Sequence, residues 1–262
     1  MDDNKGKISV VINTYNAQKH LDRVLKAVEG FDEVLVCDME STDDTVEIAK
    51  RHGCRVVTFE KKGCGIVEPA RQFAIDKALY GWVLVVDADE IVSDELRAYL
   101  YDFISKSENK ESGLYIPRMN YFMGRFMHAY YPDYILRFFK KEVTRWPAVI
   151  HTSPIVDGVV GRIPKGMANL AFLHLANDDI ATLLRKADNY SDYEVPRRKD
   201  RQYGTMALVG RPLFRFFKSY VLKGGFRDGV PGLIRAAFDG VYQFVVVAKI
   251  IEGRNNAKQP EP

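Results

Sequence analysis

The sequence is poor in cysteine and has no long hydrophobic run. Its three cysteines, Cys37, Cys54 and Cys64, are odd in number and form no Cys-x-x-Cys pair. We therefore expect free thiols in a reducing compartment, without a disulfide framework or a zinc site. The late apolar run at residues 244–248 is far shorter than the ~20 residues of a membrane-spanning helix, and the polar amino terminus lacks the apolar stretch of a signal peptide. These absences predict a cytoplasmic protein that does not span a membrane.

Two nucleotide-binding signatures are also missing. The chain has no Gly-x-x-x-x-Gly-Lys loop, which argues against a P-loop NTPase. Residues 63–68 (GCGIVE) partly imitate a dinucleotide fingerprint, but its third glycine is replaced by Glu68 and the segment follows the third strand instead of the first. The net charge of +3 is too small to suggest a nucleic-acid partner. A nicotinamide enzyme and a nucleic-acid-binding protein are therefore disfavoured.

The first hundred residues alternate between β-branched runs and segments with helical spacing. We expect strands at 8–12, 33–37, 55–59 and 82–86, and helices near 17–29, 43–52 and 69–79. Such alternation predicts a mostly parallel, Rossmann-like sheet flanked by helices, an α/β fold. From about residue 106 the pattern changes to short strands at 114–118, 134–139 and 161–164, and from about 179 it is helical.

Polar residues follow several of these strands, where ligands of a parallel sheet bind. Asp87 and Asp89 flank Ala88 directly after the fourth strand, and two carboxylates one residue apart suit Mg²⁺ or Mn²⁺ bridging to phosphates. The alternative is a solvated acidic turn before a helix that starts near Ser93. After the second strand, Asp38 caps no obvious helix and is a candidate ligand for a base or ribose.

The end of the first strand carries a run of hydrogen-bonding residues that suits a nucleobase or a ribose. These residues are Asn13, Thr14, Tyr15 and Asn16. The segment 41–44 that follows Asp38 is expected to cap the next helix, with Ser41 and Thr42 offered as N-caps.

Taken together, these motifs resemble glycosyltransferase family 2, the inverting GT-A transferases. The segments that carry the resemblance are VVINTYN (10–16), CDMESTDDT (37–45), DADE (87–90), YYPDYILRFFKK (130–141), VIH (149–151) and RPLFRFFKSYVLKGGFRDG (211–229). The last three look like the branch with bacterial lipopolysaccharide-core β-glucosyltransferases, and the resemblance covers nearly the whole chain. It implies transfer of a hexose from a nucleotide diphosphate-sugar, preferably a UDP-sugar, to a glycan or lipid-linked acceptor. It divides the chain into a nucleotide-sugar-binding half (1–105), an acceptor-binding half (106–178) and a helical C-terminal extension (179–262).

The resemblance also assigns roles to individual residues. Asp38 is expected to contact the base, and Asp87 and Asp89 are expected to hold the divalent metal and the sugar diphosphate. Arg71 falls where the family has a basic or amide side chain near the diphosphate. Close relatives have Asn at the position of Gln72.

One position departs from the branch, which usually has Val-His-Glu where this chain has Ile150-His151-Thr152. The Glu is a plausible general base, whereas a threonine hydroxyl is not a useful base at neutral pH. Asp133 and Glu90 are the substitutes, and we prefer Asp133. His151 is a candidate metal ligand through its neutral imidazole, or else a hydrogen-bonded loop histidine.

Arg137, four residues after Asp133, is the preferred cationic partner of the leaving group. Arg118 and Arg125 are either further partners or surface charges. Two rival functions stay open. A sugar-nucleotide pyrophosphorylase would usually have a glycine-rich basic loop after the first strand, which VINTYNAQ lacks, and a non-catalytic nucleotide-sugar-binding protein would fit Thr152.

The C-terminal segment is basic and aromatic. Residues 185–235 carry 12 Lys and Arg against 5 Asp and Glu, with phenylalanines and tyrosines interleaved. This composition suits a helix lying on an anionic membrane surface, here the inner face of the membrane. The alternative is a helix that packs its aromatic residues on the domain and solvates its charges.

Overall fold

The computed structural model describes residues 6–63, 66–106, 108–149, 152–175 and 179–256. The chain forms two compact units, one of Met1–Met119 with Pro132–Leu175, the other of Asn120–Tyr131 with Ala176–Pro262. The segment around residues 120–131 therefore clusters with the C-terminal helices. The division of the first unit into a donor half and an acceptor half stays a prediction.

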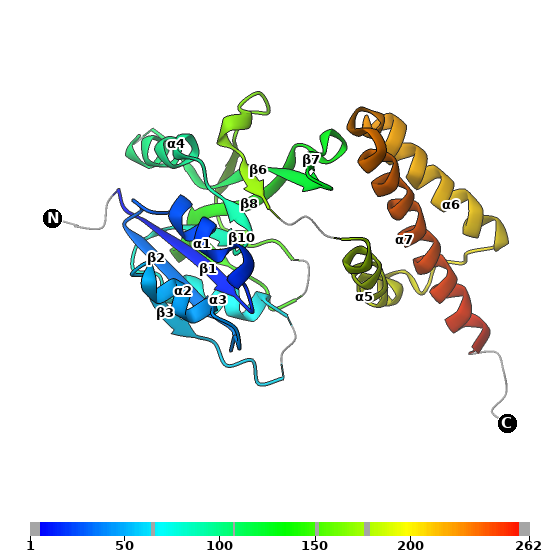
Figure 1. Cartoon of the computed structure of the whole chain (residues 1–262), viewed down its shortest axis with the longest axis horizontal. Helices are drawn as coiled ribbons and strands as arrows, with labels where there is room; N and C mark the ends of the chain where they lie inside the picture. The colour runs from blue at the N-terminus through cyan, green and yellow to red at the C-terminus, as the bar shows by residue number, and fades with distance from the viewer. Residues whose placement is uncertain (1–5, 64–65, 107, 150–151, 176–178, 257–262) are drawn as a thin grey trace. The chain divides into compact units, whose positions relative to one another are not determined.

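The first unit begins with the predicted alternation of strands and helices (Figure 1). Its elements are β1 (Ile8–Thr14), α1 (Gln18–Ala27), β2 (Glu33–Asp38), α2 (Thr45–Arg51), β3 (Arg55–Thr58), α3 (Glu68–Lys77) and β4 (Trp82–Asp87). Neighbouring strands in the order β3-β2-β1-β4 are all parallel. The Rossmann-like α/β half that the sequence predicts is confirmed.

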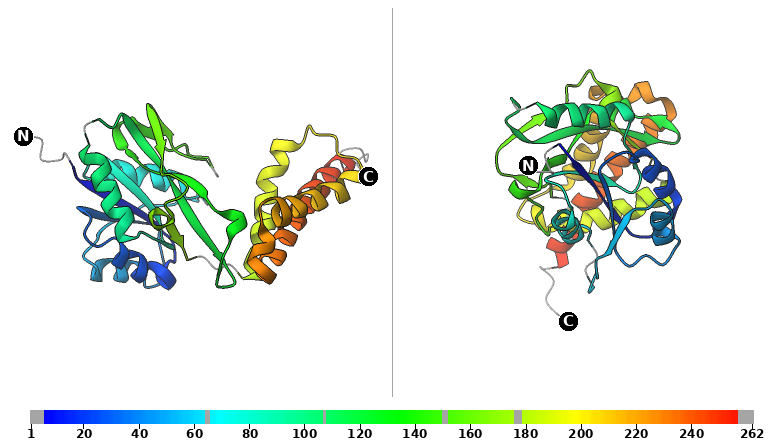
Figure 2. Two further views of the ribbon diagram at one scale, coloured as in Figure 1. Left: turned by 90° about the horizontal axis from the view of Figure 1, so that it is seen from above. Right: turned by 90° about the vertical axis from the view of Figure 1, so that its left-hand side faces the viewer.

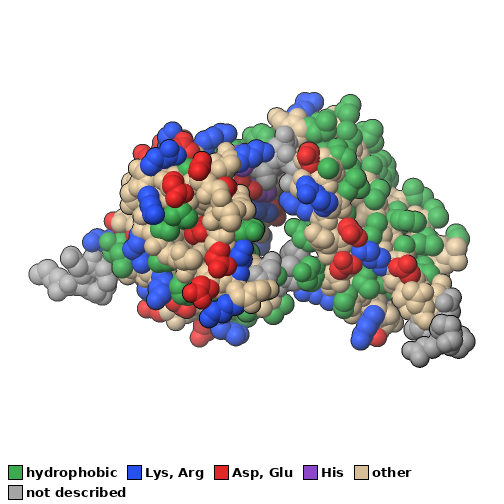
Figure 3. Space-filling view, turned by 60° about the horizontal axis from the view of Figure 1, so that its bottom comes forward, with side chains coloured by type: hydrophobic (Ala, Val, Ile, Leu, Met, Phe, Trp, Pro, Cys, Tyr) green, Lys and Arg blue, Asp and Glu red, His purple; other side chains and the backbone are tan. Residues whose placement is uncertain are grey.

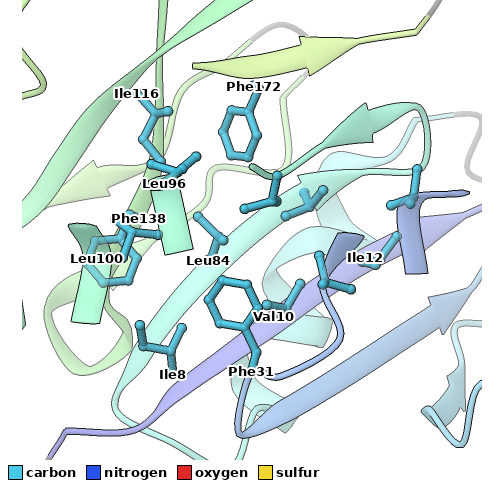
Figure 4. Packing of buried hydrophobic residues seen from close by; sticks show 14 of the residues in the cluster. Ile8, Val10, Ile12, Phe31, Leu84, Leu96, Leu100, Ile116, Phe138 and Phe172 are labelled. Carbon is cyan, nitrogen blue, oxygen red and sulfur yellow. The ribbon is translucent and has the colours of Figure 1, made fainter. Parts of the chain in front are cut away.

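Side chains of β1 alternate between the two faces of the sheet, as a period of two residues requires. Ile8, Val10 and Ile12 are buried on the face covered by α1, α2 and α4 (Asp94–Ser105). Figure 4 shows this core, with Leu84, Phe138 and Phe172 packed around the β1 residues. Val11 points to the opposite face and packs with residues of α3. Both faces of the parallel half are thus buried from solvent, which explains why its strands are almost continuously apolar.

Antiparallel strands extend the sheet beyond β4. They are β5 (Glu90–Ile91), β6 (Glu111–Phe122), β7 (Arg125–Phe126), β8 (Asp133–Lys140) and β12 (Phe172–His174). The sheet order continues β4-β8-β6-β12-β5, with β11 (Val159–Arg162) and β7 also paired to β6. β9 (Thr144–Arg145) and β10 (Ile155–Val156) form a separate antiparallel pair. Strands β6, β8 and β11 were predicted, but β5 and β12 are too short to leave a sequence signal.

The prediction for the start of α2 is wrong in detail. The helix begins at Thr45 after Asp44, whose side chain makes no capping bond, and neither Ser41 nor Thr42 caps it. Asp43 instead accepts hydrogen bonds from the backbone and hydroxyl of Thr45. Ser93 is confirmed as the N-cap of α4, because its hydroxyl accepts from the backbone N–H of Leu96.

The second unit is helical, as predicted for the end of the chain. It contains α5 (Ile180–Arg198), α6 (Thr205–Phe217) and α7 (Gly229–Asn256), and a π turn (Lys218–Leu222) and a 3₁₀ turn (Gly225–Asp228) join α6 to α7. Helices α6 and α7 run side by side (Figures 1 and 2). Gly240 of α7 lies at this contact, since a Cβ there would stand 3.2 Å from the Pro212 carbonyl oxygen.

Candidate functional site

The carboxyl ends of β1, β2 and β4 bring four of the predicted residues into one neighbourhood. Asn13 pairs in register with Asp87 across β1 and β4, and Thr14 pairs with Asp38 across β1 and β2. The side chains that follow these strands therefore converge at one edge of the sheet. This is the edge where ligands of open α/β sheets bind.

Asp87 is held between two arginines. Its Oδ1 accepts a hydrogen bond from Arg71 Nη2 at 2.7 Å, and its Oδ2 accepts one from Arg137 Nη2, also at 2.7 Å. Burial would raise the pKa of Asp87, but Arg137 and Arg71 outweigh burial and lower the pKa to about 2. One carboxylate thus faces two guanidinium groups, and the three side chains together carry a net positive charge.

Trp146 organises this pair of arginines. The guanidinium carbons of Arg71 and Arg137 lie 4.7 Å and 5.2 Å from the centre of its ring, within the range of cation–π attraction. The Trp146 backbone N–H donates to Gln72 Oε1 at 2.6 Å. Gln72 therefore supports the stack from α3.

Several buried polar atoms of this neighbourhood have no hydrogen-bond partner among the described residues. They are Nε of Arg71, Nε of Arg137, Nε1 of Trp146 and both amide atoms of Asn13. A buried donor without an acceptor is costly and rare in a folded protein. The site therefore has donor capacity that the described part of the chain does not use, which suits an anionic or polar ligand.

Hydrogen bonds join the loop after β1 to the loop after β2. Asp38 Oδ1 accepts from the hydroxyls of Thr14 and Ser41, and its Oδ2 accepts from the Ser41 backbone N–H. The Asn16 side chain accepts from the backbone N–H of Thr42 at 2.8 Å. Tyr15 is 54% exposed, and its ring faces the amine of Lys61. Thr14, Asp38 and Asn16 thus fix loop geometry in this structure, and their contact with a donor stays a prediction.

The reactivity of the Cys37 thiol tests whether β2 is buried beside this loop. Burial and the adjacent Asp38 raise the pKa of the Cys37 thiol to about 12. We expect alkylation by iodoacetamide at pH 8 to be roughly 10³-fold slower in the folded protein than in the unfolded chain, because the thiolate is the reacting species. Peptide mass spectrometry would report the rate at this site, and rapid labelling of Cys37 in native protein would contradict the register of β2.

Asp89, two residues after Asp87, has a different ionic partner. Its Oδ2 is 3.4 Å from Nε2 of His174 in β12, and no Lys or Arg of the described residues forms an ion pair with it. A carboxylate beside an imidazole is a donor set that a divalent cation such as Mn²⁺ accepts. The described residues contain no group of three or more metal-binding side chains. Two protein ligands nonetheless fit Mg²⁺ or Mn²⁺ chemistry, since such ions commonly take the rest of their ligands from water and substrate phosphates.

A second ion-pair network links the turn to β6 and β8. Arg118 Nη1 lies 3.1 Å from Oε1 of Glu90, and its Nε and Nη2 donate to Oδ2 of Asp133. Glu90 is fully buried, whereas the Asp133 side chain is 37% exposed. Burial and the neighbouring Asp87 raise the pKa of Glu90. Arg118 is therefore part of the site network and is no simple surface charge.

The structure thus joins Asp87, Arg71 and Arg137 by direct contacts, and Arg125 belongs to the C-terminal unit. Ala88 packs against the main core. His151 lies outside the described residues. Trp146 and His174 are the residues that sequence reasoning missed. Both meet their partners only through long-range folding, so no local pattern indicates them.

Two proteins and one solved structure are similar to this chain over most of its length. An uncharacterised glycosyltransferase of Rickettsia typhi is 28% identical over 257 residues, 94% of this chain and 87% of that protein. The lipopolysaccharide core biosynthesis glycosyltransferase LpsC of Rhizobium meliloti is 25% identical over 259 residues, 94% of this chain and 92% of that protein. A crystal structure of S. aureus TarS aligns with a TM-score of 0.48 and 14% identity, covering 97% of this chain and 93% of that one.

The family signal lies in the part of the chain that builds the site. Residues 9–152 match the family described as glycosyl transferase family 2. This range contains β1, β2, β4 and β8, with both arginines and both aspartates of the site. The curled α/β sheet with its added C-terminal helices is the GT-A arrangement that the resemblance implied. The chain belongs to glycosyltransferase family 2.

Proposed function

We propose that the protein transfers a hexose, with inversion, from a nucleotide diphosphate-sugar to a glycan or lipid-linked acceptor, and that it uses a divalent metal. The observation that carries this proposal is the pair Arg71 and Arg137, stacked on Trp146 and left with unused donors beside Asp87. A diphosphate supplies the acceptor oxygens that these donors lack. A UDP-sugar is the preferred donor.

The chemistry concentrates negative charge on the departing diphosphate. When the acceptor oxygen bonds to the anomeric carbon, the bond from that carbon to the diphosphate oxygen breaks. Arg71 and Arg137 are positioned to stabilise this charge, because Asp87 and Trp146 already fix their guanidinium groups and little reorganisation is needed. The metal, held by the Asp87–Asp89 turn with Asp89 and His174 as direct ligands, would add Lewis-acid stabilisation of the same leaving group.

Exposure separates the two candidates for the general base. Glu90 is fully buried beneath Arg118 and has no access to an acceptor hydroxyl. Asp133 is 37% exposed and its carboxylate is oriented by Arg118. We assign Asp133 as the base that takes the proton of the attacking hydroxyl, with Arg118 as its positioning residue.

Replacing Asp133 by Asn tests this assignment. We expect kcat to fall by roughly 10²–10⁴-fold, the usual contribution of a general base, while donor binding changes little, because the amide retains the size of the carboxylate. Steady-state kinetics with saturating donor would measure the effect, and an unchanged kcat would contradict the assignment.

Thr152 provides the companion test. Its hydroxyl donates to the backbone carbonyl of Val149 at 2.6 Å, so it is occupied with loop structure. If Asp133 is the base, Thr152→Glu should leave kcat within about twofold of wild type. A gain of transfer in Thr152→Glu would instead support a degenerate site, the non-catalytic alternative.

The acceptor class and cellular setting are proposed on the relative's function. LpsC is named for lipopolysaccharide core biosynthesis, and we propose lipopolysaccharide or another cell-surface polysaccharide as the pathway of this chain. The reaction would take place in the cytoplasm, with peripheral contact at the inner face of the membrane. We propose no nucleic-acid partner.

Ligand-induced stabilisation tests the donor class directly. A ligand that binds only the folded state raises the melting temperature by mass action. A screen of UDP, GDP, ADP and CDP, each with and without Mn²⁺, should give its largest shift with UDP and Mn²⁺ together. If none of the four nucleotides shifts the melting temperature under either condition, the donor site proposed here is wrong.

A further inference from the structure

Helix α6 carries its apolar side chains outward. Beyond its first residue, every exposed position of the helix is apolar or glycine, and these positions are Met206, Val209, Gly210, Leu213, Phe214 and Phe217. The exposed fractions of Met206, Leu213 and Phe214 are 84%, 61% and 62%. A surface helix of a protein in water normally exposes its polar face instead. The amphipathic pattern of α6 is therefore reversed.

Helix α7 shows the same reversal over most of its length. Up to Phe244, its exposed positions are spaced three or four residues apart and all are apolar: Val230, Leu233, Ala237, Val241 and Phe244. Such spacing places them in one stripe along the helix. The stripe runs beside Gly240, where α7 contacts α6.

Two charged residues of the helix pair, Arg211 and Asp239, have partners inside the unit. Arg211 lies over the ring of the buried Tyr203, with 5.0 Å from its guanidinium carbon to the ring centre. Asp239 accepts hydrogen bonds from the hydroxyls of Tyr130 and Ser219. Arg211 and Asp239 thus have partners inside the unit, while the α6–α7 apolar face, defined by the two sets of exposed residues above, has no partner in the described chain.

Both stripes lie on the same side of the helix pair. With about 100° per residue and Pro212 facing Gly240, the exposed positions of the two antiparallel helices rotate toward a common side. Figure 3 shows hydrophobic side chains gathered on this unit, with charged side chains of both signs among them. The turn between the helices adds exposed apolar residues to the face at Val221, Leu222 and Phe226.

The exposed charges at the turn end of this face have one sign. Lys218, Lys223 and Arg227 lie in the turn that joins α6 to α7. Between residues 202 and 251 the acidic residues are Asp228 and Asp239, and both are hydrogen-bonded inside the unit. The end of the α6–α7 apolar face at this turn is consequently bordered by cations, whereas the exposed Glu252 lies near Phe244 toward the other end of the face.

We propose that the α6–α7 apolar face inserts into the interface of an anionic lipid bilayer, with Lys218, Lys223 and Arg227 at the level of the lipid headgroups. Contiguous exposed apolar surface marks a binding site, and an interfacial helix pairs such a surface with basic residues. Charge favours a lipid bilayer over a second copy of this chain as the occupant of the face. Against a second copy of this chain the same cations would meet across the symmetry axis and repel, whereas anionic headgroups neutralise them.

The contact is peripheral, because no helix in the described part of the chain is long and apolar enough to span a membrane. The proposal rests on the proposed function only in naming a membrane as the partner. Binding to vesicles requires neither donor nor acceptor, so the two ideas fail separately. Loss of vesicle binding would leave donor binding intact, and absence of donor binding would leave vesicle binding intact.

Co-sedimentation of the full chain with vesicles tests the surface. We expect binding to vesicles of phosphatidylcholine with phosphatidylglycerol and much weaker binding to phosphatidylcholine alone. The variant Leu213→Glu/Phe214→Glu should lower the partition coefficient about 100-fold, since each side chain contributes about tenfold. A variant with the same added charge on the other unit, Leu79→Glu/Val159→Glu, should bind like wild type, because both control positions are similarly exposed at 58% and 57%.

The basic residues have their own test. Lys223→Gln/Arg227→Gln should weaken binding to the anionic vesicles by roughly 25-fold, about fivefold per charge, and the effect should shrink at high salt. The control Lys50→Gln/Lys165→Gln removes two exposed lysines of the first unit and should have little effect.

Three results would overturn the proposal. One is wild-type protein that ignores anionic vesicles, and another is equal binding by the Leu213→Glu/Phe214→Glu variant. The third is a wild-type protein that light scattering shows to be a dimer and that does not bind vesicles, together with a Leu213→Glu/Phe214→Glu variant that is a monomer. That result would assign the face to a second copy of the chain.

Discussion

Asp89→Ala should abolish transfer while leaving the fold intact. We expect kcat/KM to fall about 10³-fold or more, because loss of the metal removes several kcal/mol of stabilisation from the leaving group. The melting temperature should stay within about 2 °C of wild type. The Asp89 side chain has one ionic contact among the described residues, the 3.4 Å approach of His174, so its removal strands no buried charge.

The matched control is Asp102→Ala, which removes a carboxylate paired only with Lys106 on the surface of α4 and should retain full activity. Rates measured over a range of Mn²⁺ concentrations would separate weakened metal binding from loss of catalysis. If the Asp89→Ala enzyme kept the wild-type kcat/KM in a metal-free buffer, the reaction would not depend on a metal held by Asp89.

Asp87→Ala, unlike Asp89→Ala, should lower the stability of the fold. Its carboxylate is bonded to Arg71 and Arg137, whose side chains are only 13% and 8% exposed. Removing one partner of a buried pair leaves uncompensated charge. Because Asp87 itself is 25% exposed, we expect the free energy of unfolding to fall by about 2–4 kcal/mol. Urea unfolding would measure it.

A double-mutant cycle identifies the cause of that loss. Adding Arg137→Met to Asp87→Ala removes one of the two stranded guanidinium groups and should recover about half of the lost stability, since coupled neighbours are not additive. Additive losses would show that Asp87 stabilises the fold through contacts other than its arginines. Asp89→Ala serves as the neutral reference two residues away.

Much of the fold was accessible from the sequence because it rests on local patterns. The runs at Ile8, Glu33 and Trp82 gave strands β1, β2 and β4 with boundaries extended by one or two residues. Their burial on both faces makes them continuously apolar, which is the signal used. The acidic turn after β4 could be placed at the site for the same reason, since the carboxyl end of a parallel strand has a known role.

The contacts within the site could not be predicted in this way. Arg71 and Arg137 meet at Asp87 from α3 and β8, and Trp146 joins them from the position directly after β9. These segments approach one another only after the antiparallel strands extend the sheet. The start of α2 was misjudged because Ser41 has a stronger competitor for its hydrogen bonds, the buried carboxylate of Asp38, than the end of a short helix.

The reversed polarity of α6 and α7 could not be foreseen either. The sequence indicates the basic and aromatic composition, but helical spacing alone does not tell which face is covered. That follows from the Gly240 contact and from Tyr203, Tyr130 and Ser219, which bind the polar groups inside the unit. Membrane contact is thus a proposal about a surface that only the packing of the helices defines.

The most direct test of the central claim is isothermal titration of UDP into wild-type protein and into Asp89→Ala, each with and without Mn²⁺. We expect Mn²⁺ to tighten UDP binding at least tenfold in wild type and to leave the affinity of Asp89→Ala unchanged, because the cation would link the turn after β4 to the diphosphate. Equal UDP affinity in all four titrations would contradict the account, since the diphosphate would then bind without any cation held by Asp89.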